Sequence, residues 1–437
     1  MRKISTAIFI FGIFFLFSCK ENKKHSIPVK TAALQNECVH RLTDVIVYDI
    51  FNPPVAGRIY AYSNLAFYEA LRFKDSSSIS ITAKMKGFDK MPAPEKIKEY
   101  NFSLAAAKAF YKVAKSLIFS KDILVKTEIK LLEQFKKNMD ENEYNNSIAF
   151  GDSIASIILK RSATDNYRET RGMPRYNVFN NEKGKWQQTP PDYFDAMEPN
   201  WILIKPMLLD SVAQFAPPPP PPYSLDKGSE YYKQLMEVFT LTKNLTPSQD
   251  TIARYWDDNA FVTKHEGHLT YANKKTTPPG HWMGIVSILT QQNKLGEVAT
   301  AKVFALSACA MFDGFITCWH EKYKSRTIRP ITVIQENIER DWEPILQTPP
   351  FPEYISGHSV ISSAAATILT KLLGNNYAFT DTTELEYLGL QRSFKSLDEA
   401  ATEVGISRMY GGIHYRAAID QGRLQGQKIG ELYLHVY

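Results

Sequence analysis

The sequence predicts an all-α protein, a helical bundle made of two helical halves joined by a proline-rich crossover. Apolar residues recur at three- and four-residue spacing over long stretches of the 437-residue chain, which indicates amphipathic helices. Sustained alternation with a period of two, which would indicate strands, is scarce. The six consecutive prolines at 217–222 cannot be helical and favour a stiff polyproline II connection. A ligand for a proline-recognition domain is the alternative interpretation of this run.

The first residues have the pattern of an export signal. Arg2 and Lys3 precede a short apolar run, which is too short to span a bilayer comfortably, and Ser18 stands directly before Cys19. This pattern resembles a bacterial lipoprotein signal, in which the cysteine is acylated and becomes the mature N-terminus. An ordinary signal peptide or a single membrane anchor is the alternative.

The lipoprotein resemblance implies a signal peptide at 1–18, lipidation of Cys19 and a hydrated tether at 19–40. The protein would be exported to the periplasm, the outer membrane or the cell surface. Its contact with the membrane would be through the lipid anchor only.

The composition excludes some other partners. The formal charge is only +6, and no stripe of Lys and Arg alternates with aromatic residues, so we expect no binding of nucleic acid. Besides Cys19 the chain has three cysteines, which cannot all pair. Cys309 and Cys318 lie nine residues apart on one predicted helix, too far for a disulfide, so packed free thiols are the better interpretation.

The helices of the first half, residues 41–215, follow from periodicity and capping residues. One helix is expected to start at Ser103, the next at Asp122, and a third continues through the segment 147–162. From about Tyr167 the sequence becomes rich in proline, asparagine and aromatic residues, which predicts irregular structure up to the proline run. We place the linker at residues 216–228.

The second half, residues 229–437, is helical again. Thr246 followed by Pro247 is a strong helix start, because proline is well tolerated at the first helical position. A long helix is predicted from about Gly296 to Tyr323. A further helix begins at Ser356-Gly357-His358 and continues with Ala, Ile and Leu, although a histidine between hydroxyl groups is an unusual start for a buried helix.

Three segments of this half carry basic and imidazole side chains. Lys322 is followed after six residues by Arg329-Pro330; Ser356, Gly357 and His358 come next; and Ser407-Arg408 is followed after five residues by His414. Lysine and arginine supply several N–H donors, and a glycine at a helix N-terminus lets an anion approach free amides. Together these groups suit a tetrahedral or trigonal oxyanion that carries several negative charges.

This ordered triple resembles the signature of the vanadium-dependent haloperoxidases and the type 2 phosphatidic acid phosphatases (PAP2), which share a helical bundle and one oxyanion site. The resemblance implies that the anion is bound by the following residues: Lys322, Arg329, Ser356, Gly357, Arg408 and His414. Two departures stand out. The proline that the family has before Ser-Gly-His is Ile355 here. The acid that many members have four residues after the last histidine is Ala418, so we expect a backbone carbonyl to orient His414.

The two activities differ in what occupies the site. In a phosphatase, His414 would attack a phosphate monoester to form a phosphohistidine, and His358 would protonate the leaving oxygen. In a haloperoxidase, His414 would ligate the vanadium of vanadate, Lys322 would polarise the peroxide, and His358 would act as acid–base. Hydrogen peroxide would then oxidise a halide to hypohalous acid.

Two aromatic residues favour the haloperoxidase. Trp319 lies one helical turn before Lys322 and Phe351 lies five residues before Ser356, and both match positions that line the halide pocket in the family. Core packing is the alternative role for them. In the family that the chain resembles, the position of Ser356 is histidine in algal bromoperoxidases and serine in fungal chloroperoxidases and bacterial iodoperoxidases. The lipoprotein-like start then favours iodide. The expected substrates are therefore hydrogen peroxide and a halide, and helical enzymes of this type often dimerise, which leaves a homodimer open.

Two further candidates complete the analysis. The resemblance makes Asp258, rather than its neighbour Asp257, the acid expected to hold Arg408, and ordinary surface acids are the alternative interpretation of this pair. The segment His265–His268, with His281 nearby, is an alternative zinc site, but it lacks the four-residue helical step of a zinc protease. A binding lipoprotein without catalysis would keep the cationic residues but would not need two histidines.

Overall fold

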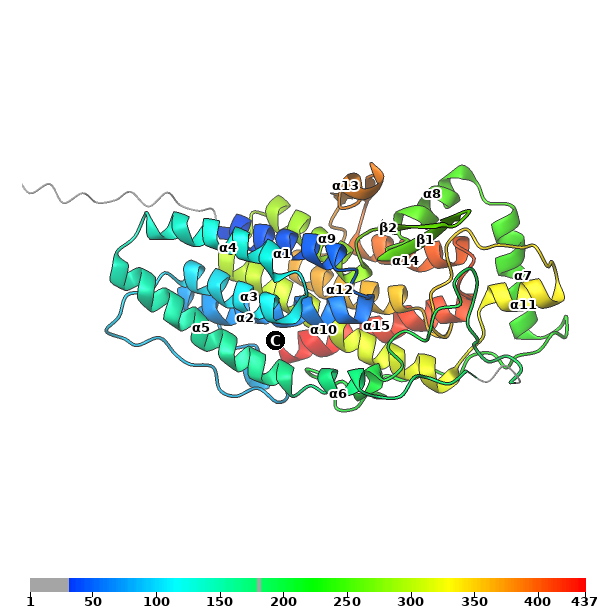
Figure 1. The fold of residues 1–437 in the computed structure, drawn as a ribbon, viewed down its shortest axis with the longest axis horizontal. Helices are drawn as coiled ribbons and strands as arrows, with labels where there is room; N and C mark the ends of the chain where they lie inside the picture. Colours follow the sequence, from blue (N-terminus) through cyan, green and yellow to red (C-terminus); the bar gives the residue numbers. More distant parts are fainter. Residues whose placement is uncertain (1–30, 179–181) are drawn as a thin grey trace, which may run out of the picture.

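The computed structural model describes residues 31–178 and 182–437, which form an elongated assembly of helices (Figure 1). The predicted signal peptide and Cys19 lie outside the described residues. The helices are α1 Thr31–Tyr48, α2 Pro53–Leu71, α3 Phe102–Leu117, α4 Lys121–Lys136, α5 Glu141–Ala163, α6 Tyr167–Arg171, α7 Glu230–Lys243, α8 Pro247–Tyr255, α9 Pro278–Gln292, α10 Glu297–Ser325, α11 Pro330–Asn337, α12 Gly357–Leu373, α13 Leu385–Leu388, α14 Leu397–Tyr410 and α15 Arg416–Val436. Short 3-10 turns are η1 Arg72–Lys74, η2 Thr82–Lys84 and η3 Trp201–Leu203.

Capping residues set several of the helix starts. Thr246 caps α8 in a reciprocal capping box with Gln249, as expected from the Thr-Pro pair. Ser356 caps α12 by accepting the N–H of Ser359. The start of α3 differs from the expectation: Asn101 is the cap, because its side chain accepts the N–H of Leu104, and Ser103 lies inside the first turn.

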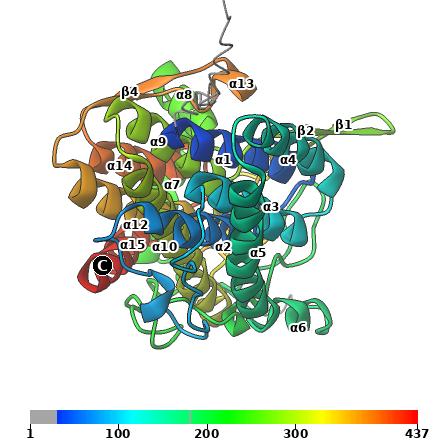
Figure 2. The same ribbon diagram turned by 90° about the vertical axis from the view of Figure 1, so that its left-hand side faces the viewer.

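The long helix α10 forms the centre of the assembly. It packs against α2 on one side and α12 on another, and α12 in turn packs against α15 (Figures 1 and 2). α10 is long and apolar enough to cross a membrane. However, 94% of its most apolar 18-residue stretch is buried inside the protein, as for the core helix of a folded protein. Its thiols, Cys309 and Cys318, are buried and unpaired, as predicted.

Close contact between α12 and α15 depends on small residues. A Cβ atom added at Gly426 would lie 2.1 Å from the carbonyl oxygen of Val360, and one at Gly422 would lie 2.8 Å from that of Ser356. These glycines are four residues apart, so they share one face of α15. That face lets the backbone of α15 come up against the first turn of α12, where the Ser356 N–H donates to the Ala418 carbonyl at 3.0 Å.

The all-α prediction is confirmed for the main architecture, with two small additions. The described residues also form two antiparallel hairpins: β1 Phe261–Glu266 with β2 Leu269–Lys274, and β3 Phe379–Asp381 with β4 Arg392–Phe394. Each strand is only three to six residues long, so its alternation is too brief to stand out in a sequence. The β1–β2 turn contains Gly267 at φ +59°, a conformation that glycine adopts readily.

The two predicted halves share one apolar core. Residues of α2, α3 and α5 belong to the same buried cluster as residues of α10, α12 and α15. The boundary at residues 216–228 therefore stays a prediction, although that segment has no helix or strand. Helix α1 begins at Thr31, inside the segment 19–40 that we expected to be a tether.

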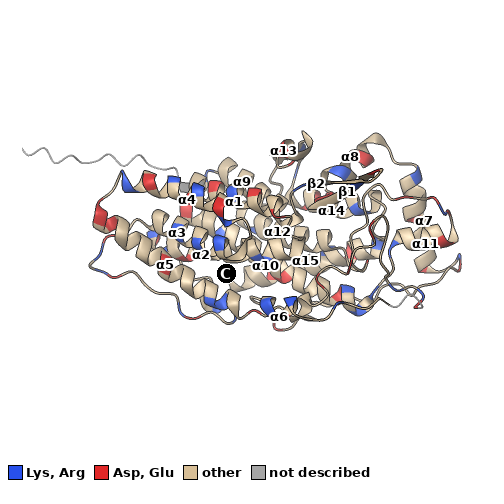
Figure 3. Cartoon of the chain, in the orientation of Figure 1, with Lys and Arg blue, Asp and Glu red and all other residues tan. Residues whose placement is uncertain are grey.

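Lys and Arg are interspersed with Asp and Glu along α1, α4 and α5 (Figure 3).

Candidate active site

The three predicted segments converge at one end of the central helices. Lys322 lies in the last turn of α10, and Arg329 is the residue that precedes α11. His358 is in the first turn of α12, Arg408 in the last turn of α14, and His414 in the loop between α14 and α15. We call these five side chains the cationic pocket.

The loop before α12 holds the first two cations by its carbonyl groups. Lys322 Nζ donates to the carbonyl oxygens of Pro352 at 2.9 Å and Glu353 at 3.0 Å. Arg329 Nε donates to the carbonyl of Phe351 at 2.9 Å, and its Nη1 donates to that of the residue before His414 at 2.7 Å. Both side chains are fully buried, so these bonds fix where their remaining N–H groups point.

A carboxylate, not a backbone carbonyl, orients His414. The Oε1 atom of Glu353 lies 2.8 Å from His414 Nδ1 and also accepts the N–H of Tyr415 at 2.9 Å. Burial raises the pKa of Glu353 to about 7. In its ionised form Glu353 can only accept, so Nδ1 then carries the proton. The other ring nitrogen, Nε2, is then free of a proton and faces Arg329 Nη1 at 3.3 Å. This is the tautomer that can bond to the central atom of an oxyanion.

The expectation for Asp258 was wrong. Arg408 Nη1 donates to the carbonyl oxygens of Trp256 at 2.7 Å and Asp257 at 3.3 Å, not to a carboxylate. Asp258 has a left-handed backbone, with φ 43°, and this turns its side chain toward His281, whose Nδ1 lies 2.9 Å from Oδ1. The charges of both aspartates raise the pKa of Arg408 through space, although its burial has the larger, opposite effect.

Ser356 and Gly357 lie where the anion hypothesis needs them, at the N-terminus of α12. The Ser356 oxygen accepts from the N–H and the hydroxyl of Ser359, at 3.3 and 3.0 Å, which leaves its own hydroxyl proton free to donate. The N–H groups of a first helical turn have no intrahelical acceptor. The hydroxyl of Ser359 therefore helps Ser356 to cap the helix, which explains why serines stand on both sides of the histidine.

The two predicted aromatic residues lie together beside the cations. The rings of Trp319 and Phe351 are 5.0 Å apart between centroids. Lys322 Nζ is 4.9 Å from the centroid of the Phe351 ring, and Arg329 Cζ is 5.0 Å from the same centroid. Trp319 is held by a hydrogen bond from its Nε1 to the carbonyl of Met197. Phe351 thus forms one wall against both cations.

Burial depresses the pKa of every basic group in the cationic pocket. The pKa of Lys322 falls to about 7 and that of Arg329 to about 10, chiefly because burial disfavours the charged form. The pKa values of His358 and His414 lie well below the usual range because of burial and the neighbouring cations. Both imidazoles are therefore neutral at neutral pH, and the pocket is short of negative charge.

Three polar atoms of this pocket are buried and have no hydrogen-bond partner among the described residues. They are Arg329 Nη2, Arg408 Nε and His358 Nε2. A buried polar atom without a partner costs about 1–3 kcal/mol. Three such atoms in one positively charged pocket fit the binding of a polar, negatively charged group.

The alternative zinc site does not assemble as predicted. His265 lies on β1, where its Nε2 is 2.8 Å from Asp192, whereas His281 is buried on α9 and contacts Asp258 and Asp381. Sequence reasoning also missed Glu353, the acid that orients His414. A lone carboxylate in the apolar, proline-rich segment before Ser-Gly-His was the available signal.

Comparisons with known proteins agree with this geometry. Residues 302–437 match a family profile described as the VCPO second helical-bundle domain. No curated protein sequence matches. The crystal structure of the first bacterial vanadium-dependent iodoperoxidase is 41% identical, covers 92% of this chain and 96% of its own, and has a TM-score of 0.87.

Two more distant structures share the fold. The holo form of a bacterial vanadium-dependent chloroperoxidase is 17% identical, with coverage of 89% of this chain and 93% of its own and a TM-score of 0.67. Its apo form is 16% identical, with coverage of 89% and 95% and a TM-score of 0.66. At 41% identity over nearly the whole length, the first similarity decides the assignment: the chain belongs to the vanadium-dependent haloperoxidase family.

Proposed function

We propose that this protein is a vanadate-dependent haloperoxidase that oxidises halide, with iodide as the preferred ion, by hydrogen peroxide to hypohalous acid. The observation that carries the proposal is the buried cationic pocket in which His414 presents an unprotonated Nε2, held in that state by Glu353. The similarity to an iodoperoxidase over 92% of the chain supports the same activity.

Vanadate fits the residues of the pocket. Its oxygens would be bound by Lys322, Arg329 and Arg408, by the hydroxyl of Ser356 and by the amide of Gly357. Its vanadium would be bound by His414 Nε2. The unpartnered Arg329 Nη2 and Arg408 Nε would then gain acceptors. Bound vanadate supplies a Lewis acid that activates peroxide toward attack by a halide.

His358 is suited to move protons at this site. Its Nε2 is buried and unpartnered, and its depressed pKa leaves it neutral, so it can accept a proton from hydrogen peroxide and return it later. Lys322 is suited to stabilise negative charge on a peroxide oxygen. Two backbone carbonyls use two of its N–H groups, and the third remains for this role.

The preference for iodide rests on the aromatic wall and on the access route. Trp319 and Phe351 offer polarisable surface to a large, soft anion, and iodide is the easiest halide to oxidise. Next to them is a mostly apolar cavity of about 520 Å³, whose lining includes Met197, Pro350 and Phe261. Met197 joins cavity and wall, because its carbonyl accepts the Trp319 N–H at 3.2 Å.

One assay separates this function from a PAP2-type phosphatase. The purified protein is loaded with vanadate, and triiodide formation from iodide and hydrogen peroxide is followed beside hydrolysis of p-nitrophenyl phosphate. We expect iodide oxidation that depends on vanadate, and weak or no oxidation of bromide. Phosphate ester hydrolysis without iodide oxidation would establish the phosphatase instead.

The location of the protein is a separate proposal. The apolar run followed by Ser18-Cys19 supports export, acylation of Cys19 and attachment of the mature protein to a membrane through lipid alone. A Cys19→Ala variant is expected to lose incorporation of labelled palmitate and to leave the membrane fraction. Equal membrane retention of the variant and the wild type would contradict anchoring through Cys19.

The oligomeric state is a further prediction. A homodimer is expected, and sedimentation analysis of the purified protein can test it.

A further inference from the structure

A second buried group of titratable side chains lies behind the cationic pocket. His281 on α9 is fully buried between three carboxylates, and we call this set the acidic cluster: Asp258, Asp381, Glu384 and His281. The side chains of the three acids are exposed by 2% or less. Nothing in the proposed halide reaction uses these groups.

The acidic cluster has more negative than positive charge. Within 4 Å, the only cation that its three carboxylates meet in the described chain is His281. Nearby Lys275 already pairs with Asp257 at 2.8 Å. Glu384 Oε1 is buried, has no hydrogen-bond partner among the described residues, and lies 3.7 Å from His281 Nδ1. A buried carboxylate oxygen without a donor is costly, and here it is aimed at a potential ligand atom.

The geometry points to a divalent transition-metal site, with zinc as the best occupant, formed by Asp258 Oδ1, His281 Nδ1 and Glu384 Oε1. These atoms lie within 4.8 Å of one another, with the imidazole nitrogen 2.9 Å from Asp258 and 3.7 Å from Glu384. Ligands at about 2.0–2.2 Å from a tetrahedral zinc ion lie about 3.3–3.6 Å apart, so small side-chain movements suffice.

Asp381 completes the arrangement from outside. Its Oδ2 lies 2.8 Å from His281 Nε2, the nitrogen that would not bind metal. Metal-bound histidines commonly donate this second N–H to a carboxylate, which fixes the ring and strengthens the ligand. The oxygen and nitrogen donors favour zinc and related ions over calcium or magnesium, which prefer all-oxygen sites.

Without metal, a proton takes the place of the ion. His281 then carries protons on both nitrogens, and the surrounding carboxylates raise its pKa well above the usual range even though burial opposes this. The pKa of Glu384 is raised, chiefly through burial. Metal binding releases the proton from Nδ1 and any proton on Glu384, and the two carboxylates balance the dication.

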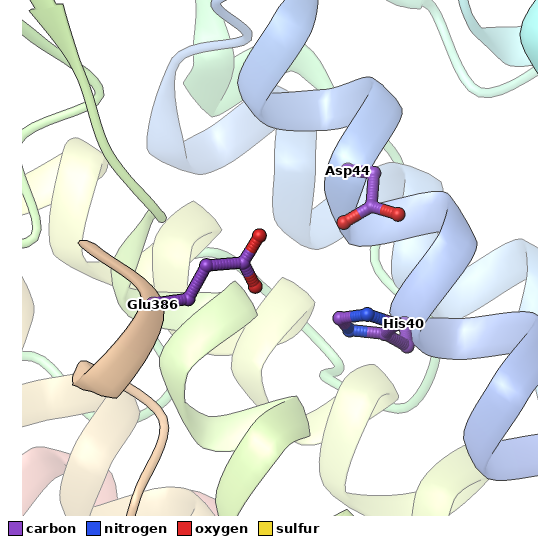
Figure 4. Close-up of side chains that lie close together, drawn as sticks. All are labelled: His40, Asp44 and Glu386. Atoms are coloured by element: carbon purple, nitrogen blue, oxygen red, sulfur yellow. The ribbon is translucent and has the colours of Figure 1, made fainter.

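A cavity lies beside the cluster. It has a volume of about 510 Å³, lies between α1, α9 and α13, and is lined by the buried His281, by Thr383 and by the exposed His40 and Glu386. Figure 4 shows His40 and Asp44 on α1 facing Glu386 of α13. These outer groups attract cations, but Asp44 already accepts from Arg41 at 3.2 Å, and we assign no site to them.

The metal would serve the cationic pocket indirectly. Asp258 follows Trp256 and Asp257, whose carbonyls hold Arg408, and it has the left-handed φ of 43° that non-glycine residues rarely adopt. A metal ligated by Asp258 would fix this strained turn. The site would thus be structural, and Asp258 would be a positioning residue for the oxyanion site.

The test measures zinc in untagged protein. Wild type, Glu384→Gln and the control Glu386→Gln are titrated with ZnCl₂, dialysed, and analysed for zinc and vanadium by mass spectrometry. We expect one zinc per chain in wild type and in Glu386→Gln, and affinity reduced by at least about tenfold in Glu384→Gln. An anomalous signal at the zinc edge between Asp258, His281 and Glu384 in wild-type crystals would locate the ion without any variant.

The outcomes distinguish the two proposals. No retained zinc in wild type, or equal retention in wild type and Glu384→Gln, overturns the metal site and leaves a protonated His281. Zinc retention that depends on Glu384 supports it, whatever the vanadium content. If the wild type binds zinc but no vanadium, the proposed haloperoxidase function is contradicted and the proposed zinc site still stands.

Discussion

The cationic pocket and the acidic cluster place the same side chain in opposite states. His414 and His281 are both buried, yet the pKa of His414 lies well below the usual range and that of His281 well above it. Burial lowers both. The difference is the neighbours: three cations surround His414, whereas three carboxylates surround His281. The sign of the local charge therefore decides what each histidine can bind, and it makes one site suited to an anion and the other to a cation.

The largest expected effect comes from removing the two histidines of the cationic pocket one at a time. His414→Ala should lose vanadate binding, because it removes the Nε2 atom that is proposed to bind vanadium and that the Nδ1–Glu353 contact orients. His358→Ala should keep vanadate and lose about 10²–10⁴-fold in the rate of iodide oxidation. Vanadium content and turnover are measured on both variants. If both retain full activity, the assignment of the pocket is wrong.

The second prediction contrasts the two histidines in stability. His281→Gln should destabilise the protein by about 3–5 kcal/mol, because it leaves buried carboxylates without their cation. His414→Gln in vanadate-free protein should destabilise it much less. His414 is neutral, so its replacement removes one hydrogen bond to Glu353 and no charge. Urea unfolding of the two variants beside wild type gives the comparison. Equal destabilisation by the two substitutions would contradict the opposite charge states assigned to His281 and His414.

Changing the acid behind His414 should have an intermediate effect. Glu353→Gln keeps the shape and the oxygen acceptor but removes the charge that supports His414 and faces Lys322. We expect vanadate affinity to fall about 10–100-fold, which is typical for groups that orient a metal ligand. The matched control is Glu343→Gln, an exposed acid in the same loop, which should bind vanadate as wild type does.

The smallest effect is a pH dependence of anion binding. The pKa of Lys322 is about 7 in the anion-free protein, so above pH 7 this lysine must take up a proton to face an anion as a cation. Affinity for phosphate should then fall by up to about tenfold per pH unit above 7, with proton uptake on binding. Calorimetry in buffers of different ionisation enthalpy measures that proton, and Lys322→Met should abolish it.

The sequence alone was enough for the helical architecture, because long apolar periodicities and the Thr246-Pro247 and Ser356-Gly357 starts are local signals. Resemblance to a family signature of set spacing singled out Lys322, Arg329, His358, Arg408 and His414, and their role in catalysis stays a prediction. The hairpins escaped notice because three to six residues carry too little periodicity.

Only the tertiary structure decided which groups face one another. Glu353 and His414 are far apart in the chain, and so are Asp258, His281 and Glu384, so no spacing rule could pair them. Asp258 was expected beside Arg408, but its left-handed backbone turns it to His281. Charge state followed from the same packing, because a pKa depends on burial and neighbouring charges, and neither is encoded locally in the sequence.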